Sequence, residues 1–137
     1  MDDAARDALA LTHASTAWDR TAEITTIGGH SGLPRRIEIW FYRVGDTNYL
    51  SGMPGPTPDW FRNLEANPRF TLHLKHGVQA NLKATAHPVT DAAERRRIFT
   101  AIVADLNQSA NPGRIRQPTS VQEWVDGSVL VEIEFDS

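Results

Sequence analysis

Apolar and polar residues alternate along several short segments of this chain, and this pattern constrains the fold more than any other feature. Apolar side chains occupy every second position of 70–74, and after a turn at His76-Gly77 a second alternating run covers 79–87. Successive side chains of a strand point to opposite faces, so these two runs predict a hairpin with one face in solvent. The other face has to be buried against further strands or helices.

Strand character returns in four further segments of the sequence: 23–27, 36–44, 48–51 and 129–135. Glycine and proline clusters at 28–34 and 52–56 predict turns that bound these segments. Six antiparallel strands tend to close into a small barrel, because closure removes exposed sheet edges. A chain of 137 residues has room for one domain. We therefore expect a single α+β domain over 1–137, with a six-stranded antiparallel barrel from about 22 to 137.

Three segments predict helices around this barrel. Residues 4–18 are rich in alanine and contain neither glycine nor proline. A short helix is expected between Thr57 and Asn67, because a threonine cap followed by a proline favours a helix start and Pro68 favours a stop. Apolar residues at helical spacing predict an amphipathic helix over about 91–107. A loop at about 108–120 then leads to the last strand.

Composition excludes several classes of chemistry. The chain has no cysteine, and none of its five histidines pair at the i, i+4 spacing of a zinc helix, so we expect no metal site. A net charge of −3 argues against a nucleic-acid partner. The apolar stretches are far shorter than the roughly 20 residues that span a bilayer, and the N-terminus is acidic where a secretory signal is basic. We expect a cytoplasmic protein without a transmembrane segment.

Positive charge is concentrated in the middle of the chain, where 34–97 carries ten Arg and Lys against six Asp and Glu. This segment either holds a small anion or exposes its charges to solvent. Arg35 and Arg36 are expected to point to opposite faces of the strand that they start, so that one of them could clamp a phosphate or carboxylate. The glycine-rich segment 28–32 before them fits a tight turn or, as the alternative, a phosphate cradle.

The short helix presents two faces with different expected roles. Trp60, Phe61 and Leu64 share one face, which we expect to pack on the barrel or to form a ligand wall. Arg62 and Asn63 lie on another face and could contact a ligand without disturbing the core.

Two motifs carry a resemblance to a known family. The first is Ile27-Gly28-Gly29-His30-Ser31-Gly32-Leu33-Pro34-Arg35, followed by the strand at 37–41, and the second is Trp60-Phe61-Arg62-Asn63-Leu64-Glu65-Ala66-Asn67-Pro68. In this order and spacing they resemble the deazaflavin (F420)-dependent nitroreductase family. That family is a branch of the flavin/deazaflavin oxidoreductases with the FMN-binding split β-barrel fold, which is also found in pyridoxamine phosphate oxidases. The likeness runs from about residue 24 to 106.

The resemblance implies a homodimer with cofactor sites at its interface, binding coenzyme F420 or, as the alternative, FMN. Arg35 matches the arginine that closes the family's turn, and Ser51 matches the serine that ends the third strand. The helix motif is matched by Trp60, Asn63, Asn67 and Pro68. After that serine relatives often have a lysine and glycines, whereas this chain has Gly52-Met53-Pro54-Gly55-Pro56. The lysine's contact to an anionic cofactor tail then falls to Arg35, Arg36 or Arg62.

The resemblance also implies a reaction, in which reduced F420 transfers a hydride to a quinone, enone or nitro-type acceptor while the protein supplies orientation and excludes water. The candidate cofactor-binding residues are Arg35, Arg36, Ile37, Ser51, Gly52, Met53, Pro54, Trp60, Arg62 and Asn63. Tyr42, Tyr49 or water is expected to deliver the proton. We expect the N-terminal helix and the 108–120 loop to shape the acceptor pocket. A barrel that binds a flavin, tetrapyrrole or lipid without turnover is the remaining alternative.

Overall fold

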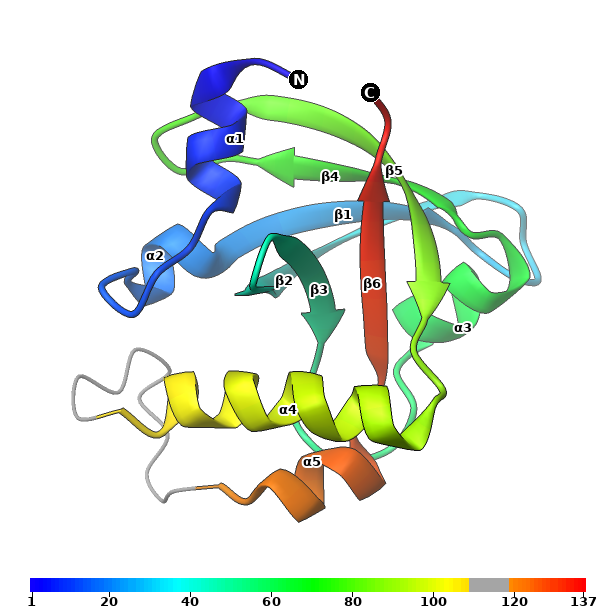
Figure 1. The fold of residues 1–137 in the computed structure, drawn as a ribbon. Helices are drawn as coiled ribbons and strands as arrows, with labels where there is room; N and C mark the ends of the chain where they lie inside the picture. Colours follow the sequence, from blue (N-terminus) through cyan, green and yellow to red (C-terminus); the bar gives the residue numbers. More distant parts are fainter. Residues whose placement is uncertain (109–118) are drawn as a thin grey trace.

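The computed structural model describes residues 1–108 and 119–137, and within them six antiparallel strands close into a barrel (Figure 1). The strands are β1 (Thr21–Ile27), β2 (Pro34–Val44), β3 (Thr47–Ser51), β4 (Arg69–Leu74), β5 (Ala80–Pro88) and β6 (Leu130–Phe135). Their order around the barrel is β1-β2-β3-β6-β5-β4, and β4 pairs with β1 to complete the ring. The predicted six-stranded antiparallel barrel is confirmed.

The inner face of the barrel is covered unevenly along β2. Ile24 and Thr26 of β1 are buried, and their cross-strand partners on β2 are Ile37 and Arg35. Cross-strand partners share a face of the sheet. Ile37 is nevertheless 37% exposed and Arg35 is exposed, whereas Phe41 farther along the same face is fully buried. The first half of β2 therefore presents an uncovered inner face.

Five helices occur in the described residues: α1 (Asp3–Leu9), α2 (Ala17–Arg20), α3 (Asp59–Ala66), α4 (Ala92–Leu106) and α5 (Val121–Gly127). The helices α4 and α5 pack side by side at the end of the barrel opposite α1 (Figure 1). A second apolar cluster lies beneath them and includes Tyr42 of β2, Tyr49 of β3 and Trp124 of α5. The outer face of β2 and β3 is thus buried under helices. No helix in this part of the chain is both long enough and apolar enough to cross a membrane.

The prediction of one helix over 4–18 is wrong, because α1 ends at Leu9 and α2 starts only at Ala17. Hydroxyl side chains between them bind nearby backbone N–H groups and so compete with helical hydrogen bonds. Ser15 Oγ accepts the N–H of Thr12 at 2.8 Å, and Thr12 Oγ1 in turn accepts a neighbouring N–H. Thr16 then caps α2 through a reciprocal capping box.

Helix α5 lies in the segment just before the last strand, where no helix was expected. Ser120 caps it by accepting the N–H of Glu123 at 3.1 Å, and Trp124 is its fully buried residue. A serine three residues before an acid, with an apolar residue following, is a recognisable helix start. Most of the loop expected over 108–120 lies outside the described residues.

Candidate functional site

A cavity of about 320 Å³ lies where the end of β3 meets three helices. Its lining residues come from both faces of β2, from the end of β3 and the loop after it, and from α3, α4 and α5: Ile39, Trp40, Tyr42, Ser51, Gly52, Met53, Trp60, Leu106 and Trp124. None of these side chains carries a charge. A cavity of this size and lining suits a flat, largely apolar ring system.

Four of the predicted cofactor-binding residues meet at this cavity, namely Ser51, Gly52, Met53 and Trp60. Ser51 is buried, and its hydroxyl donates to the carbonyl of Val129 at 2.6 Å. That bond uses the only hydrogen of the hydroxyl, so Ser51 can accept a hydrogen bond from a ligand but cannot also donate one. It also fastens the end of β3 to the segment before β6.

The loop after β3 is held against α5. The N–H of Gly55 donates to the carbonyl of Gly127 at 3.1 Å. A side chain at Gly127 would place its Cβ 3.0 Å from the Cβ of Pro54, so the two segments meet as closely as glycine permits. At Gly52, by contrast, a Cβ would meet no atom within 4 Å in the described residues. Gly52 therefore leaves open a part of the pocket wall that a side chain would fill.

Three of the four tryptophans of the chain line the cavity: Trp40, Trp60 and Trp124. Trp124 is fully buried, with its ring centroid 5.9 Å from that of Phe99 and its Nε1 donating to Thr119 Oγ1 at 2.7 Å. These contacts fix the indole plane. Trp60, which the helix pattern placed either in the core or at a ligand, does both, because it packs against the barrel core and also reaches the cavity.

The two tyrosines proposed as proton donors occupy different places. Tyr42 lines the cavity and is 6% exposed, whereas its cross-strand partner Tyr49 is buried beneath α4 and is not among the lining residues. Burial raises the pKa of Tyr42 well above its ordinary value. Its phenol stays protonated at neutral pH and is suited to donating a hydrogen bond rather than to giving up its proton.

The glycine-rich segment before β2 forms a tight turn that α3 holds in place. The N–H of Gly28 donates to the carbonyl of Leu33 at 2.8 Å, and Gly32 adopts the positive φ of 68° that the turn requires. Asn63 of α3 accepts the N–H of Gly29 at 3.1 Å and donates to the buried Thr26 Oγ1 at 3.2 Å. The Asn63 amide is thus occupied by protein partners on both sides.

Arg35 and Arg36 lie on opposite faces of β2 and have different surroundings. Arg36 Nε donates to Glu23 Oε1 at 2.5 Å on the outer face, where Lys75 Nζ also binds Glu23 at 2.8 Å. The hydrogen bonds from Lys75 and Arg36 lower the pKa of Glu23 to about 2. Arg35 lies on the inner face beside Gly28, and it forms no ion pair with any residue of 1–108 or 119–137. Arg35 is therefore available to an anion, whereas Arg36 is already paired.

The other predicted cofactor residues are not among those that line the cavity. Arg62 is exposed on α3 and has no acidic partner in the described segments. Ile37 lies on the exposed half of β2, and Pro54 packs on Gly127. The lining residues that sequence reasoning missed are Ile39, Trp40, Leu106 and Trp124. Leu106 and Trp124 belong to helices far from the motifs in sequence, so no local pattern links them to the site.

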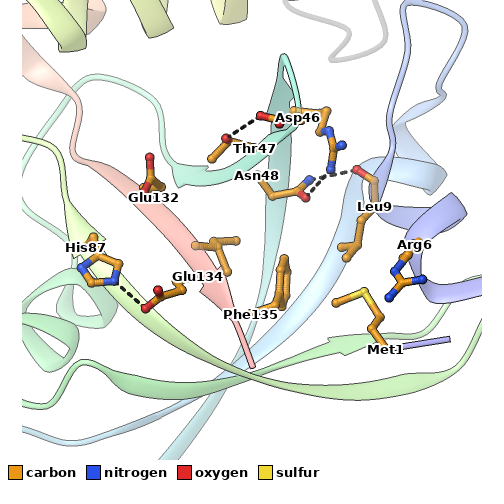
Figure 2. Close-up of a pocket in the computed structure, with 12 residues that line it drawn as sticks. Met1, Arg6, Leu9, Asp46, Thr47, Asn48, His87, Glu132, Glu134 and Phe135 are labelled. Carbon is orange, nitrogen blue, oxygen red and sulfur yellow. Dashed lines mark hydrogen bonds and ion pairs between the residues drawn. The ribbon is translucent and has the colours of Figure 1, made fainter. Parts of the chain in front are cut away.

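A second pocket, of about 460 Å³, lies at the opposite end of the barrel between α1, the β2–β3 turn and β6 (Figure 2). Figure 2 shows polar and charged side chains among its lining residues, including Asp46, Glu132 and Arg6, with His87 facing Glu134. None of the predicted cofactor residues lines it. Helix α1, expected to shape the acceptor pocket, contributes to this second pocket and to none of the wall of the first.

The closed six-stranded antiparallel barrel with flanking helices places the protein in the class of split-barrel folds, which also contains structures of the pyridoxamine phosphate oxidase type. Within that class, residues 11–120 match the family model of the F420H(2)-dependent quinone reductases. The chain belongs to this family. It is an oxidoreductase, and its cofactor is coenzyme F420.

Solved structures share the fold at low sequence identity. An FAD-binding protein from Mesorhizobium loti is 14% identical, with a TM-score of 0.65 over 100% of this chain and 91% of its own. A structure described as an F420-H2 dependent reductase is 17% identical, with a TM-score of 0.55 over 84% of this chain and 94% of its own. A candidate pyridoxamine 5'-phosphate oxidase from Listeria innocua is 16% identical, with a TM-score of 0.56 and coverage of 86% and 85%.

The cavity fits the ring of a deazaflavin and not its charged tail. The wall is aromatic and uncharged, and the bare Gly52 leaves room for a ring to approach the backbone. A volume of about 320 Å³ is near the lower limit for ligand pockets. The described lining of the cavity offers no charged side chain to an anionic tail.

Proposed function

We propose that this cavity holds the deazaflavin ring of coenzyme F420 and that a quinone, enone or nitro-type acceptor is reduced beside it. When bound, the cofactor supplies the hydride. The observation that carries the proposal is the meeting of Ser51, Gly52, Met53 and Trp60 in one uncharged aromatic cavity. The contribution of the chain is orientation of the ring and exclusion of water.

Ser51 and Tyr42 are the two hydroxyl-bearing side chains among the lining residues of the cavity, and they offer complementary hydrogen bonding. Ser51 Oγ is restricted to accepting, because its hydrogen goes to Val129. Tyr42 keeps its proton, because burial disfavours the phenolate. We propose that Tyr42 orients a ligand by donating a hydrogen bond, and that the proton consumed in the reaction comes from water. Tyr49 is too far inside the helix-covered core to take either role.

Arg35 and Arg62 are our candidates for holding the anionic tail of the cofactor. Both are exposed and free of acidic partners in the part of the chain that is described. A guanidinium can bind a phosphate or carboxylate through two parallel hydrogen bonds. These arginines would replace the lysine that relatives often carry after the β3 serine, where this chain has Gly52 and Met53.

A homodimer is our proposal for the assembly. Leu33 and Met53 are 60% and 62% exposed, and Ile37 between them in the chain is also exposed on the uncovered half of β2. Exposed large apolar side chains of this kind are candidates for a surface that a second copy of the chain covers. Sedimentation or light scattering with a Leu33→Ser, Ile37→Ser variant tests this assembly directly.

The test of function is a titration of the purified protein with oxidised F420, followed by cofactor fluorescence, with FMN as the comparison ligand. We expect F420 to bind and a quinone, an enone or a nitroarene to oxidise reduced F420 in turnover. Gly52→Val should weaken F420 binding by at least tenfold while leaving the melting temperature nearly unchanged, because the new side chain enters the cavity and meets no protein atom. Gly52→Ala should give a smaller loss. Unchanged F420 binding by the Gly52→Val variant would show that the cofactor site lies elsewhere.

A further inference from the structure

Arg20, the last residue of α2, is a buried charged residue with several hydrogen-bond partners. It is 1% exposed, and its guanidinium bonds to three different residues. Nη1 donates to Asp105 Oδ2, Nη2 donates to the carbonyl of Thr12 at 3.0 Å, and Nε donates to the carbonyl of Ser15 at 3.2 Å. Arg20 thereby fastens the segment between α1 and α2 to the C-terminal end of α4.

Asp105 connects this cluster to the candidate pocket. It precedes Leu106, which is the α4 residue in the pocket wall. Leu106 and Tyr42 belong to the same apolar cluster beneath α4 and α5, so the position of the end of α4 also determines the packing around Tyr42. The ion pair is therefore connected to two lining residues, to Leu106 along the chain and to Tyr42 through the apolar cluster, although neither Arg20 nor Asp105 lines the cavity itself.

A buried ion pair is weak evidence for stability, because desolvation offsets most of the attraction between the charges. Such a pair does fix the relative position of the two residues, because the planar guanidinium can donate its hydrogen bonds to a carboxylate only within a narrow range of orientations. Asp105 is held further by Gln108, whose Nε2 donates to Oδ1 at 2.8 Å, and His13 Nδ1 lies 3.1 Å from the same oxygen. The end of α4 is thus held from two sides.

We propose that Arg20 and Asp105 are positioning residues of the cofactor pocket, which set Leu106 and Tyr42 at the distance from β3 that the deazaflavin ring needs. This inference rests on the proposed function of the cavity. It assigns to the N-terminal segment an indirect role in binding, exerted through α4, in place of the direct contact with the acceptor that the sequence led us to expect.

The test replaces the pair by apolar residues of similar size, Arg20→Met with Asp105→Leu, because such a replacement often preserves or raises stability. The matched control is Arg69→Met with Asp136→Leu, which removes an ion pair joined by two hydrogen bonds of 2.8 Å at the barrel edge, away from the cavity. The readouts are the melting temperature and the dissociation constant for oxidised F420, measured without turnover. We expect the Arg20/Asp105 variant to bind F420 about tenfold more weakly, as coupling between contacting residues allows, and the control to bind normally.

A double-mutant cycle identifies the route of the effect. If the pair acts through Leu106, adding Leu106→Ala to the Arg20/Asp105 variant should cause little further loss of F420 affinity. Should the double variant fail to fold, Arg20→Lys decides the matter, since lysine keeps the charge but cannot bind Asp105, Thr12 and Ser15 together. A folded variant whose F420 affinity equals that of the control overturns the proposal. Failure of the wild-type protein to bind F420, or normal binding by Gly52→Val, would instead count against the function of the cavity.

Discussion

Replacing Asn63 by alanine distinguishes an architectural residue from a cofactor ligand. The change removes two hydrogen bonds, one from the N–H of Gly29 and one to Thr26 Oγ1, and Thr26 is 1% exposed. Each lost bond costs about 1 kcal/mol, and a buried group left without a partner costs more, so the free energy of unfolding should fall by roughly 2–3 kcal/mol. For a chain of this length that corresponds to a melting temperature about 6–12 °C lower.

Urea unfolding and thermal melting measure this effect, with Asn67→Ala as the matched control, since no side-chain hydrogen bond of Asn67 is found in the described residues. F420 binding should weaken only modestly and in step with the loosened turn beside Arg35. A full-stability Asn63→Ala protein that has lost F420 binding would refute this reasoning and make Asn63 a direct ligand. Loss of stability in Asn67→Ala of equal size would also refute it, because the specific bonds would then not matter.

Two further predictions concern charged residues of β1 and β2. Arg35→Ala should weaken F420 binding by about 1–3 kcal/mol, at least fivefold, if its guanidinium meets a phosphate or carboxylate. Arg36→Ala, on the opposite face, should leave the dissociation constant for F420 unchanged. Equal effects of the two substitutions would contradict the assignment of faces. Glu23 has a folded-state pKa of about 2, below its ordinary 4.5, so its ion pairs stabilise the fold above pH 4.5, and that contribution is lost as the pH falls toward 2. Glu23→Gln should therefore flatten the dependence of the urea midpoint on pH in this interval, and an unchanged slope would show that the network contributes nothing.

The strands were predictable because their signal is local. Alternation along 70–74 and 79–87 already defines which side chains face inward, and β4 and β5 occupy these segments and pair as an antiparallel hairpin. The glycine turn and the break at Pro68 are likewise fixed by the chemistry of single residues. For these elements the tertiary structure did not have to override the local preference.

The prediction of a single N-terminal helix was wrong, and the reason is visible in the local sequence. Alanine favours a helix, but Thr12, Ser15 and Thr16 offer hydroxyl groups that bind nearby backbone N–H groups instead. The burial of Arg20 against Asp105 could not have been predicted, because the two residues are 85 positions apart and belong to separate helices. Long-range ion pairs leave no mark on the sequence around either partner.

The site was predictable only along the motif that forms one of its walls. Ser51, Gly52, Met53 and Trp60 are close together in sequence, and all four line the cavity. The opposite wall is built by Leu106 and Trp124, which reach it only because α4 and α5 pack against the outer face of β2 and β3. Arg35 and Arg36 were assigned to opposite faces correctly, but which of them was free depended on Glu23 and Lys75 across the sheet.

The distribution of the indole rings has a practical consequence. Trp40, Trp60 and Trp124 surround the cavity, while Trp18 is 63% exposed and stacked on His76 with a centroid distance of 3.4 Å. The tryptophan fluorescence of the protein therefore arises largely from residues of the cavity wall. In a Trp18→Phe variant this fluorescence would report directly whether a ligand occupies the cavity, including acceptors that absorb no visible light.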